Sequence, residues 1–182
     1  MKFKNVILLL IDFFESHQVD YALTGAFALK AYGYLRATRD VDFVGRQEDQ
    51  FKIIQFLESL GFETRYRSTG YSNHCHGFPG LGQIDFVYVS GKTATTIFSE
   101  AHRISILKDV RLPVVTPMHL VAMKVFAMKN DPRRRLREMA DIEYLMTLPQ
   151  VRTEDVKAYF EREGLLKDFQ EIIRGKETYE ND

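Results

Sequence analysis

Hydrophobic residues follow two different spacings in the first part of this chain. Some segments place apolar residues three or four positions apart, as in a helix with one buried face, and others place them at every second position, as in a strand. The helical spacing occurs over residues 3–17, 26–33, 48–61 and 93–101. The alternating pattern occurs over residues 19–25, 39–45, 62–67, 83–89 and 104–115. The arrangement predicts an α+β fold for residues 1–115.

Two segments between these elements are predicted to be connections. Residues 68–82 are rich in turn-forming residues and predict a loop. The polar pair Lys108 and Asp109 predicts a turn between two strands within residues 104–115.

The pattern becomes wholly helical from Thr116 onward. Threonine is a favoured helix N-cap, and Pro117 follows it at the first helical position, where the missing N–H of proline costs nothing. Helical spacing then covers residues 116–130, 133–148, 153–164 and 165–175, and the acidic tail at 177–182 is expected to fray. The sequence predicts an α/β core at residues 1–115 and a C-terminal helical part at residues 116–182, packed on that core.

Charge and cysteine content narrow the functional classes. The 25 basic and 25 acidic side chains give a net charge of zero, which points neither to DNA nor to an anionic membrane as an obligatory partner. The single cysteine, Cys75, allows no intrachain disulfide and no CxxC metal or redox motif, which fits a reducing cytoplasm. No apolar run approaches the roughly 18 to 20 residues of a membrane span.

Three carboxylates are the candidate chemistry. Asp40 and Asp42 lie one residue apart in the strand pattern "RDVDFVG", so both project to the same side, and Asp85 lies in a second strand pattern, "QIDFVYV". If the two strands are neighbours, three like charges converge, and Mg²⁺ ions with oxygen ligands are the natural compensation. A pair of such ions typically serves phosphoryl or nucleotidyl transfer. The alternative for Asp40 and Asp42 is a strand facing water, with ion pairs to Arg36 or Arg39.

The paired histidines of "NHCHG" are a second candidate, and a weak one. His74 and His76 flank Cys75, but adjacent residues of a strand point to opposite faces, and two histidines without further ligands do not fill a tetrahedral zinc shell. His76, close to the Asp85 strand, is a candidate for the wall of a nucleotide pocket.

The segments "GAFALKAYGYLRATRDVDF" and "IDF" together resemble the DNA polymerase β-type nucleotidyltransferase superfamily. That superfamily combines a Gly-Gly or Gly-Ser turn, a later hDhDh strand (h, hydrophobic) and a third carboxylate on a further strand. The segment "LVAMKVFAMKNDPRRRLREMADIEYL" is similar to the AbiEii/MenT-like branch of toxin-like minimal nucleotidyltransferases. The resemblance covers about residues 20 to 147. It implies a polymerase β-like fold, with a mixed sheet flanked by helices.

The resemblance also implies roles for individual residues. Gly25 and Ala26 would contact the triphosphate; Asp40 and Asp42 would hold both metal ions, and Asp85 would complete the metal site and activate the acceptor hydroxyl. Lys124 would neutralise the β- and γ-phosphates, with Asp141 orienting it.

This sequence departs from the pattern at two places. Ala26 replaces a serine or glycine, and Arg137-Glu138 replaces the Lys-Asp of a KDxxD-like motif. Simpler interpretations also stay open in this region. Lys124 could extend its stem over the core, Asp141 could be an ordinary ion-pair partner, and "RRRLR" at 133–137 could be a solvated face or could guide a polyanion such as tRNA.

The predicted function is therefore Mg²⁺-dependent transfer of NMP from an NTP, such as ATP, to an acceptor hydroxyl, with Mn²⁺ as an alternative ion. The acceptor is an RNA 3′ end such as that of tRNA, a protein side chain or a small molecule, and the toxin-like branch would add a cognate antitoxin as a partner. A catalytically silent nucleotidyltransferase fold that binds a nucleotide or a partner is the main alternative. A metal-dependent phosphohydrolase is a third.

Overall fold

The structure is a computed structural model that describes residues 3–38, 40–78, 80–107 and 110–180. The chain forms two compact units, Met1–Val115 and Thr116–Asp182, and each is described by itself.

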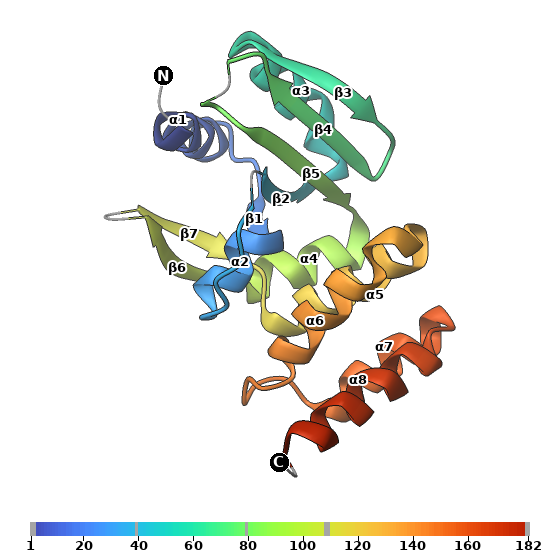
Figure 1. The fold of residues 1–182 in the computed structure, drawn as a ribbon. Coiled ribbons are helices and arrows are strands. Elements are labelled where there is room, and N and C mark those ends of the chain that lie inside the picture. Colours follow the sequence, from blue (N-terminus) through green and yellow to red (C-terminus); the bar gives the residue numbers. More distant parts are fainter. Residues whose placement is uncertain (1–2, 39, 79, 108–109, 181–182) are drawn as a thin grey trace. The chain divides into compact units, whose positions relative to one another are not determined.

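The first unit is built on one mixed sheet. Within the described ranges the sheet has seven strands in the order β3-β4-β5-β2-β1-β7-β6 (Figure 1). The strands are β1 (Tyr21–Thr24), β2 (Asp40–Arg46), β3 (Phe62–Arg67), β4 (Tyr71–His76), β5 (Gln83–Val89), β6 (His102–Leu107) and β7 (Val110–Val114). β2 pairs in parallel with β5, and β1 with β7, whereas the other neighbours are antiparallel.

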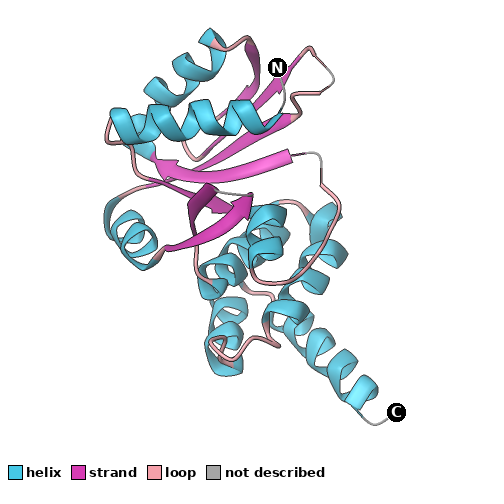
Figure 2. Ribbon diagram, turned by 90° about the vertical axis from the view of Figure 1, so that its left-hand side faces the viewer, coloured by secondary structure: helices cyan, strands magenta, loops and turns pink. Residues whose placement is uncertain are grey.

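The helices of this unit are α1 (Phe3–Ser16), α2 (Gly25–Ala31), α3 (Gln50–Ser59) and α4 (Gly91–Glu100), with a short 3-10 turn at Gln47–Asp49. Figure 2 shows helices in cyan lying against the magenta strands. α1 and α3 pack on one face of the sheet, where an aromatic cluster forms the core. Phe14 of α1 lies 5.9 Å from Phe43 and 6.1 Å from Phe86, centroid to centroid. The other face of β2 and β5 carries the acidic residues.

The second unit is helical. It contains α5 (Pro117–Asn130), a 3-10 turn (Pro132–Arg134), α6 (Arg135–Leu145), α7 (Thr153–Glu163) and α8 (Leu166–Glu180). α5 begins as predicted, because the Thr116 side chain accepts a hydrogen bond from the His119 amide and Pro117 occupies the first turn. Among the described residues of the chain, no helix is both long and apolar enough to cross a membrane.

The sequence prediction fails at two segments. The predicted loop at 68–82 contains strand β4, whose buried polar residues, Ser72 and His74, conceal the usual strand pattern. The acidic tail is helical as far as Glu180 instead of fraying from residue 177, since glutamate and lysine are themselves good helix formers. The predicted turn at Lys108 and Asp109 lies outside the described residues.

Candidate functional site

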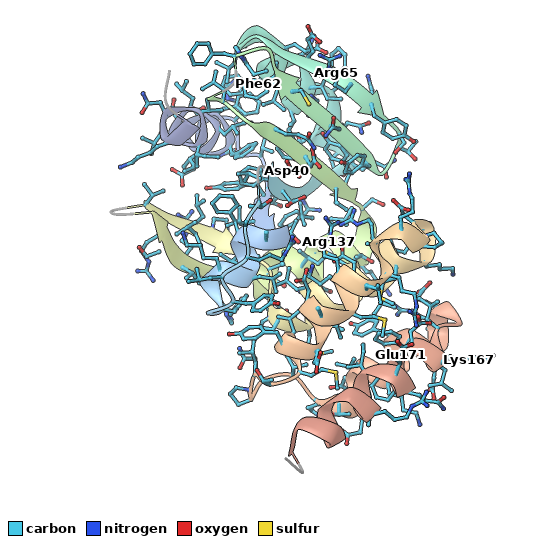
Figure 3. The ribbon with its side chains drawn as sticks, viewed as in Figure 1. Asp40, Phe62, Arg65, Arg137, Lys167 and Glu171 are labelled. Atoms are coloured by element: carbon cyan, nitrogen blue, oxygen red, sulfur yellow. The ribbon has the colours of Figure 1, made fainter. Side chains whose placement is uncertain are left out.

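Two of the three predicted carboxylates lie side by side on the sheet. Asp42 of β2 and Asp85 of β5 are direct register partners, and neighbouring strands are about 4.8 Å apart. Paired residues project to the same face, so the two carboxylates share it. Asp40 lies two residues earlier on that face, opposite Gln83, and Figure 3 labels it on the sheet.

Core packing on the opposite face fixes this register. Phe43 and Phe86 are the next pair along the same two strands, and their rings stack at 5.4 Å. Both side chains are fully buried. A slip of one residue would turn every side chain of the slipped strand to the other face, exposing one phenylalanine and burying an aspartate against apolar side chains. The hydrophobic pair therefore holds the two carboxylates together.

The Asp85 carboxylate is directed toward β4. Its Oδ2 accepts from the Tyr71 hydroxyl at 2.7 Å, and its Oδ1 accepts from Asn73 Nδ2 at 2.5 Å. Gln83 Nε2 donates to Oδ1 at 3.0 Å and to Oδ2 at 3.3 Å. Within the described ranges, no three His, Cys, Asp or Glu residues gather as they would around a metal ion. The metal-binding role of Asp40, Asp42 and Asp85 therefore stays a prediction.

Tyr71, Asn73 and Gln83 are site residues that the sequence pattern did not identify. The missing signal was β4 itself. Once β4 is recognised, Tyr71 and Asn73 fall on alternate positions of a strand paired with β5, so both face the side of Asp85.

Tyr71 is a permanent hydrogen-bond donor at this site. Burial raises its pKa well above the ordinary value, and the hydrogen bond and charge of Asp85 and the charge of Asp42 raise it further. The phenol therefore stays protonated at any physiological pH.

Gly25 lies directly against Asp42. The residue has a φ of +61°, and a Cβ built on it would lie 2.0 Å from Asp42 Oδ2. Only glycine satisfies both conditions without strain. Ala26 follows and is buried, 3% exposed. The predicted change from strand to helix near Gly25 is confirmed, and it brings the chain to the carboxylate face.

We expect Gly25→Ala to be much more damaging than Gly91→Ala. Gly91 has a similar φ, +57°, and also begins a helix after a strand, but a Cβ there would meet nothing within 4 Å. Gly91→Ala should therefore cost only the backbone strain of about 1–2 kcal/mol, whereas Gly25→Ala adds a collision with Asp42. Urea unfolding of both variants measures the difference, and equal losses of unfolding free energy would contradict the close approach.

Lys124 and Asp141 meet inside the helical unit, together with a third residue. Lys124 Nζ of α5 donates to Asp141 Oδ2 of α6 at 2.5 Å and to Glu138 Oε2 at 2.8 Å. All three side chains are buried. Burial favours the protonated form of Glu138, but Lys124 and Arg134 outweigh it and lower its pKa to about 2. The glutamate that departs from the KDxxD-like pattern is thus part of the lysine's ion cluster.

The arginine run at 133–137 is not a free basic patch, because each of its arginines faces an acid. Arg133 pairs with Asp131 at 2.8 Å. Arg134 and Arg137 pair with Glu138 at 2.7 and 3.2 Å. Arg135 pairs with Asp168 and with Glu171, which Figure 3 labels on α8. These partners neutralise much of the charge that a polyanion would use.

The two histidines beside Cys75 lie on the core face of β4, where they pack and form hydrogen bonds. His74 is fully buried on the core face of β4, with Nε2 at 2.7 Å from Ser72 Oγ and Nδ1 at 3.2 Å from Thr64 Oγ1. Burial lowers its pKa to about 4, so the ring is neutral at physiological pH. His76 alternates to the same face, away from Asp85, and packs edge-on against Phe62 at 5.1 Å.

Comparison with known proteins supports the fold. No protein-family model and no curated protein matches the sequence. The antibiotic-resistance factor ANT(2″)-Ia in solution matches with a TM-score of 0.66 at 12% identity, over 100% of this chain and 99% of that chain. Its complex with adenylyl-2″-tobramycin matches with a TM-score of 0.63 at 11% identity, over 87% and 95%. The lincosamide antibiotic adenylyltransferase LnuA, with lincomycin bound, matches with a TM-score of 0.54 at 18% identity, over 77% and 94%. The predicted nucleotidyltransferase fold is confirmed.

Proposed function

We propose that this chain transfers an NMP group from an NTP to an acceptor hydroxyl and releases pyrophosphate. The observation that carries the proposal is the in-register pair Asp42 and Asp85, with Gly25 against Asp42. In this reaction the acceptor oxygen forms a bond to the α-phosphorus while the bond to pyrophosphate breaks. The acceptor proton passes to a carboxylate, for which Asp85 is the candidate.

Asp40, Asp42 and Asp85 are proposed to hold two Mg²⁺ ions, with Mn²⁺ as a substitute. The residues fit such ions, because carboxylate oxygens are preferred ligands and the absence of a Cβ at Gly25 lets the backbone of the turn lie against the Asp42 carboxylate. When bound, the ions supply positive charge beside the triphosphate. Gly25 and Ala26 are proposed to contact the triphosphate through their backbone N–H groups.

Lys124 is proposed to neutralise charge on the β- and γ-phosphates. An ammonium group has three N–H donors, and two of those of Lys124 are directed at Glu138 and Asp141. These two carboxylates are then the groups that orient the third.

A small molecule is the acceptor that we favour. The fold matches ANT(2″)-Ia over nearly the whole of both chains; that protein is described as an antibiotic-resistance factor, and LnuA as a lincosamide antibiotic adenylyltransferase. A tRNA acceptor would be better served by free arginines than by a run paired with acids. A tRNA or protein acceptor, with an antitoxin partner, is the alternative that follows from the AbiEii/MenT-like resemblance. ATP is the first donor to test, because both neighbours are described with adenylyl transfer.

The proposal is tested by following transfer of α-³²P label from each NTP, with Mg²⁺ or Mn²⁺. Acceptors are polyhydroxylated small molecules (tobramycin and lincomycin among them), total tRNA and cell-extract protein. Labelled small molecule with equimolar pyrophosphate, lost in an Asp40→Asn/Asp42→Asn double variant, is the expected result. Label in tRNA or in protein would show that the acceptor is a macromolecule and not the small molecule that we favour.

Two other results would contradict nucleotidyl transfer itself. Phosphate release without a labelled acceptor would identify a phosphohydrolase. NTP binding with no chemistry under any of these conditions would identify a silent module.

A further inference from the structure

The Asp85 carboxylate is saturated with hydrogen bonds from three neighbours. Each of its oxygens accepts from two donors, supplied by Tyr71, Asn73 and Gln83. A carboxylate has about four acceptor positions, so all of them are engaged. Asp85 is only 8% exposed, and a buried carboxylate depends on such donors.

The donors are of two kinds. Tyr71 and Asn73 approach from β4 with short bonds of 2.7 and 2.5 Å, each to a different oxygen, so together they fix the plane of the carboxylate. Gln83 lies on the same strand as Asp85, and its longer bonds of 3.0 and 3.3 Å share one amide between both oxygens. A shared, longer hydrogen bond is the weaker one.

Gln83 also has the place that a substrate group would need. It is the register partner of Asp40, so its side chain stands on the carboxylate face, beside Asp40 and two residues before Asp85. Like Tyr71 and Asn73 it is partly exposed, but its bonds to Asp85 are the longest of the three. Of the three donors it is therefore the one that a hydroxyl arriving at Asp85 can displace with least loss.

We propose that Tyr71 and Asn73 are positioning residues that hold Asp85 for the acceptor hydroxyl, and that Gln83 holds the acceptor's place until it binds. The inference rests on the proposed function. Gln83 contacts both carboxylate oxygens, so its displacement frees one acceptor position on each of them, one for the acceptor O–H and one that would remain for a metal ion. The acceptor O–H passes its proton to Asp85 as its oxygen bonds the α-phosphorus and pyrophosphate leaves. Tyr71 and Asn73 keep the receiving oxygens in line throughout.

The experiment compares Tyr71→Phe, Asn73→Ala and Gln83→Ala with wild type, in the full chain, with ATP and the acceptor found for the wild type. Loss of one hydrogen bond to a charged group should lower kcat by about 10- to 100-fold in the first two variants, with the KM for ATP within about twofold. Gln83→Ala should keep kcat and lower the KM for the acceptor. Tyr66→Phe is the matched control, because Tyr66 is 58% exposed and contacts Tyr71 only through its ring.

The variant Asn73→Asp tests whether Asn73 acts as a hydrogen-bond donor to Asp85 or only by packing. The aspartate keeps the shape of asparagine but turns a donor into a repelling acceptor 2.5 Å from Asp85 Oδ1. Donation predicts that Asn73→Asp has a lower kcat than Asn73→Ala, whereas packing predicts the reverse. Thermal unfolding of each variant confirms that it is folded at the assay temperature.

The outcomes distinguish the inference from the function on which it rests. A wild type that transfers no nucleotide overturns both. An active wild type whose Tyr71→Phe and Asn73→Ala variants keep their kcat, or whose Asn73→Asp variant is the milder one, overturns the inference and leaves the function standing. An unchanged acceptor KM in Gln83→Ala overturns the placeholder role of that residue.

Discussion

Asp42→Asn is expected to lower nucleotidyl transfer by about 1,000-fold while leaving the protein folded. Removing one preorganised charged group from a site of this kind costs 10²- to 10³-fold or more in rate, and Asp42 is the carboxylate that Gly25 and Asp85 both adjoin. Asparagine keeps the shape of the side chain, so β2 and its pairing are preserved. The measurement is the initial rate of transfer at saturating ATP and acceptor.

Stability should move in the opposite direction from activity. Asp42 and Asp85 are like charges on paired positions, and removing one of them relieves repulsion. The unfolding free energy of Asp42→Asn should therefore equal or exceed that of wild type. Asp12→Asn is the control, because Asp12 is exposed on α1, which packs on the face of the sheet opposite the carboxylates. A folded Asp42→Asn variant with a rate within tenfold of wild type would contradict the assignment.

Lys124→Met is expected to destabilise the helical unit by about 3–5 kcal/mol, the usual cost of removing one partner from a buried ion pair. The ammonium is shared by Glu138 and Asp141, and both carboxylates are buried, 1% and 0% exposed. Methionine fills much the same volume as lysine, so the loss of unfolding free energy measures the removal of the charge and not the creation of a cavity. Lys129→Met on the same helix is the matched control, since its pair with Glu163 is half exposed on the lysine side and worth at most about 1 kcal/mol.

The deficit of Lys124→Met in unfolding free energy should depend on pH. In wild type the pKa of Glu138 falls from 4.5 to about 2, so its stabilisation is complete above pH 4.5 and disappears as the pH falls toward 2. The variant lacks the share of this stabilisation that Lys124 provides, so its deficit relative to wild type should be largest above pH 4.5 and should narrow as the pH falls toward 2. Amide hydrogen exchange of Lys124→Met should show that the loss of stability lies in α5 and α6. A deficit no larger than that of Lys129→Met would contradict a buried cluster.

Local pattern was sufficient wherever one segment decides its own structure. The alternation of "RDVDFVG" put Asp40 and Asp42 on one face of a strand, and the change of spacing after residue 25 predicted the passage from strand to helix at Gly25. Thr116 and Pro117 predicted the start of α5 for the same reason, because capping uses neighbouring groups only. The hydrophobic pattern did not reveal strand β4. Its buried polar residues Ser72 and His74 hydrogen-bond to each other, and the sequence pattern does not show such a pairing.

The sequence by itself determined the elements and the chemistry of the side chains: two acids on one face of a strand, a third in another, a lysine on a helix and an arginine-rich run. Only the tertiary structure decided what those groups meet. Pairing of β2 with β5 depends on the distant Phe43 and Phe86 stacking beneath α1, and it sets Asp42 beside Asp85. Pairing of β4 with β5 surrounds Asp85 with donors, and packing of α5 on α6 gives Lys124 its two carboxylates. Such contacts join residues far apart in the chain, and they form because burial of apolar surface, which no single segment can achieve alone, selects which segments meet.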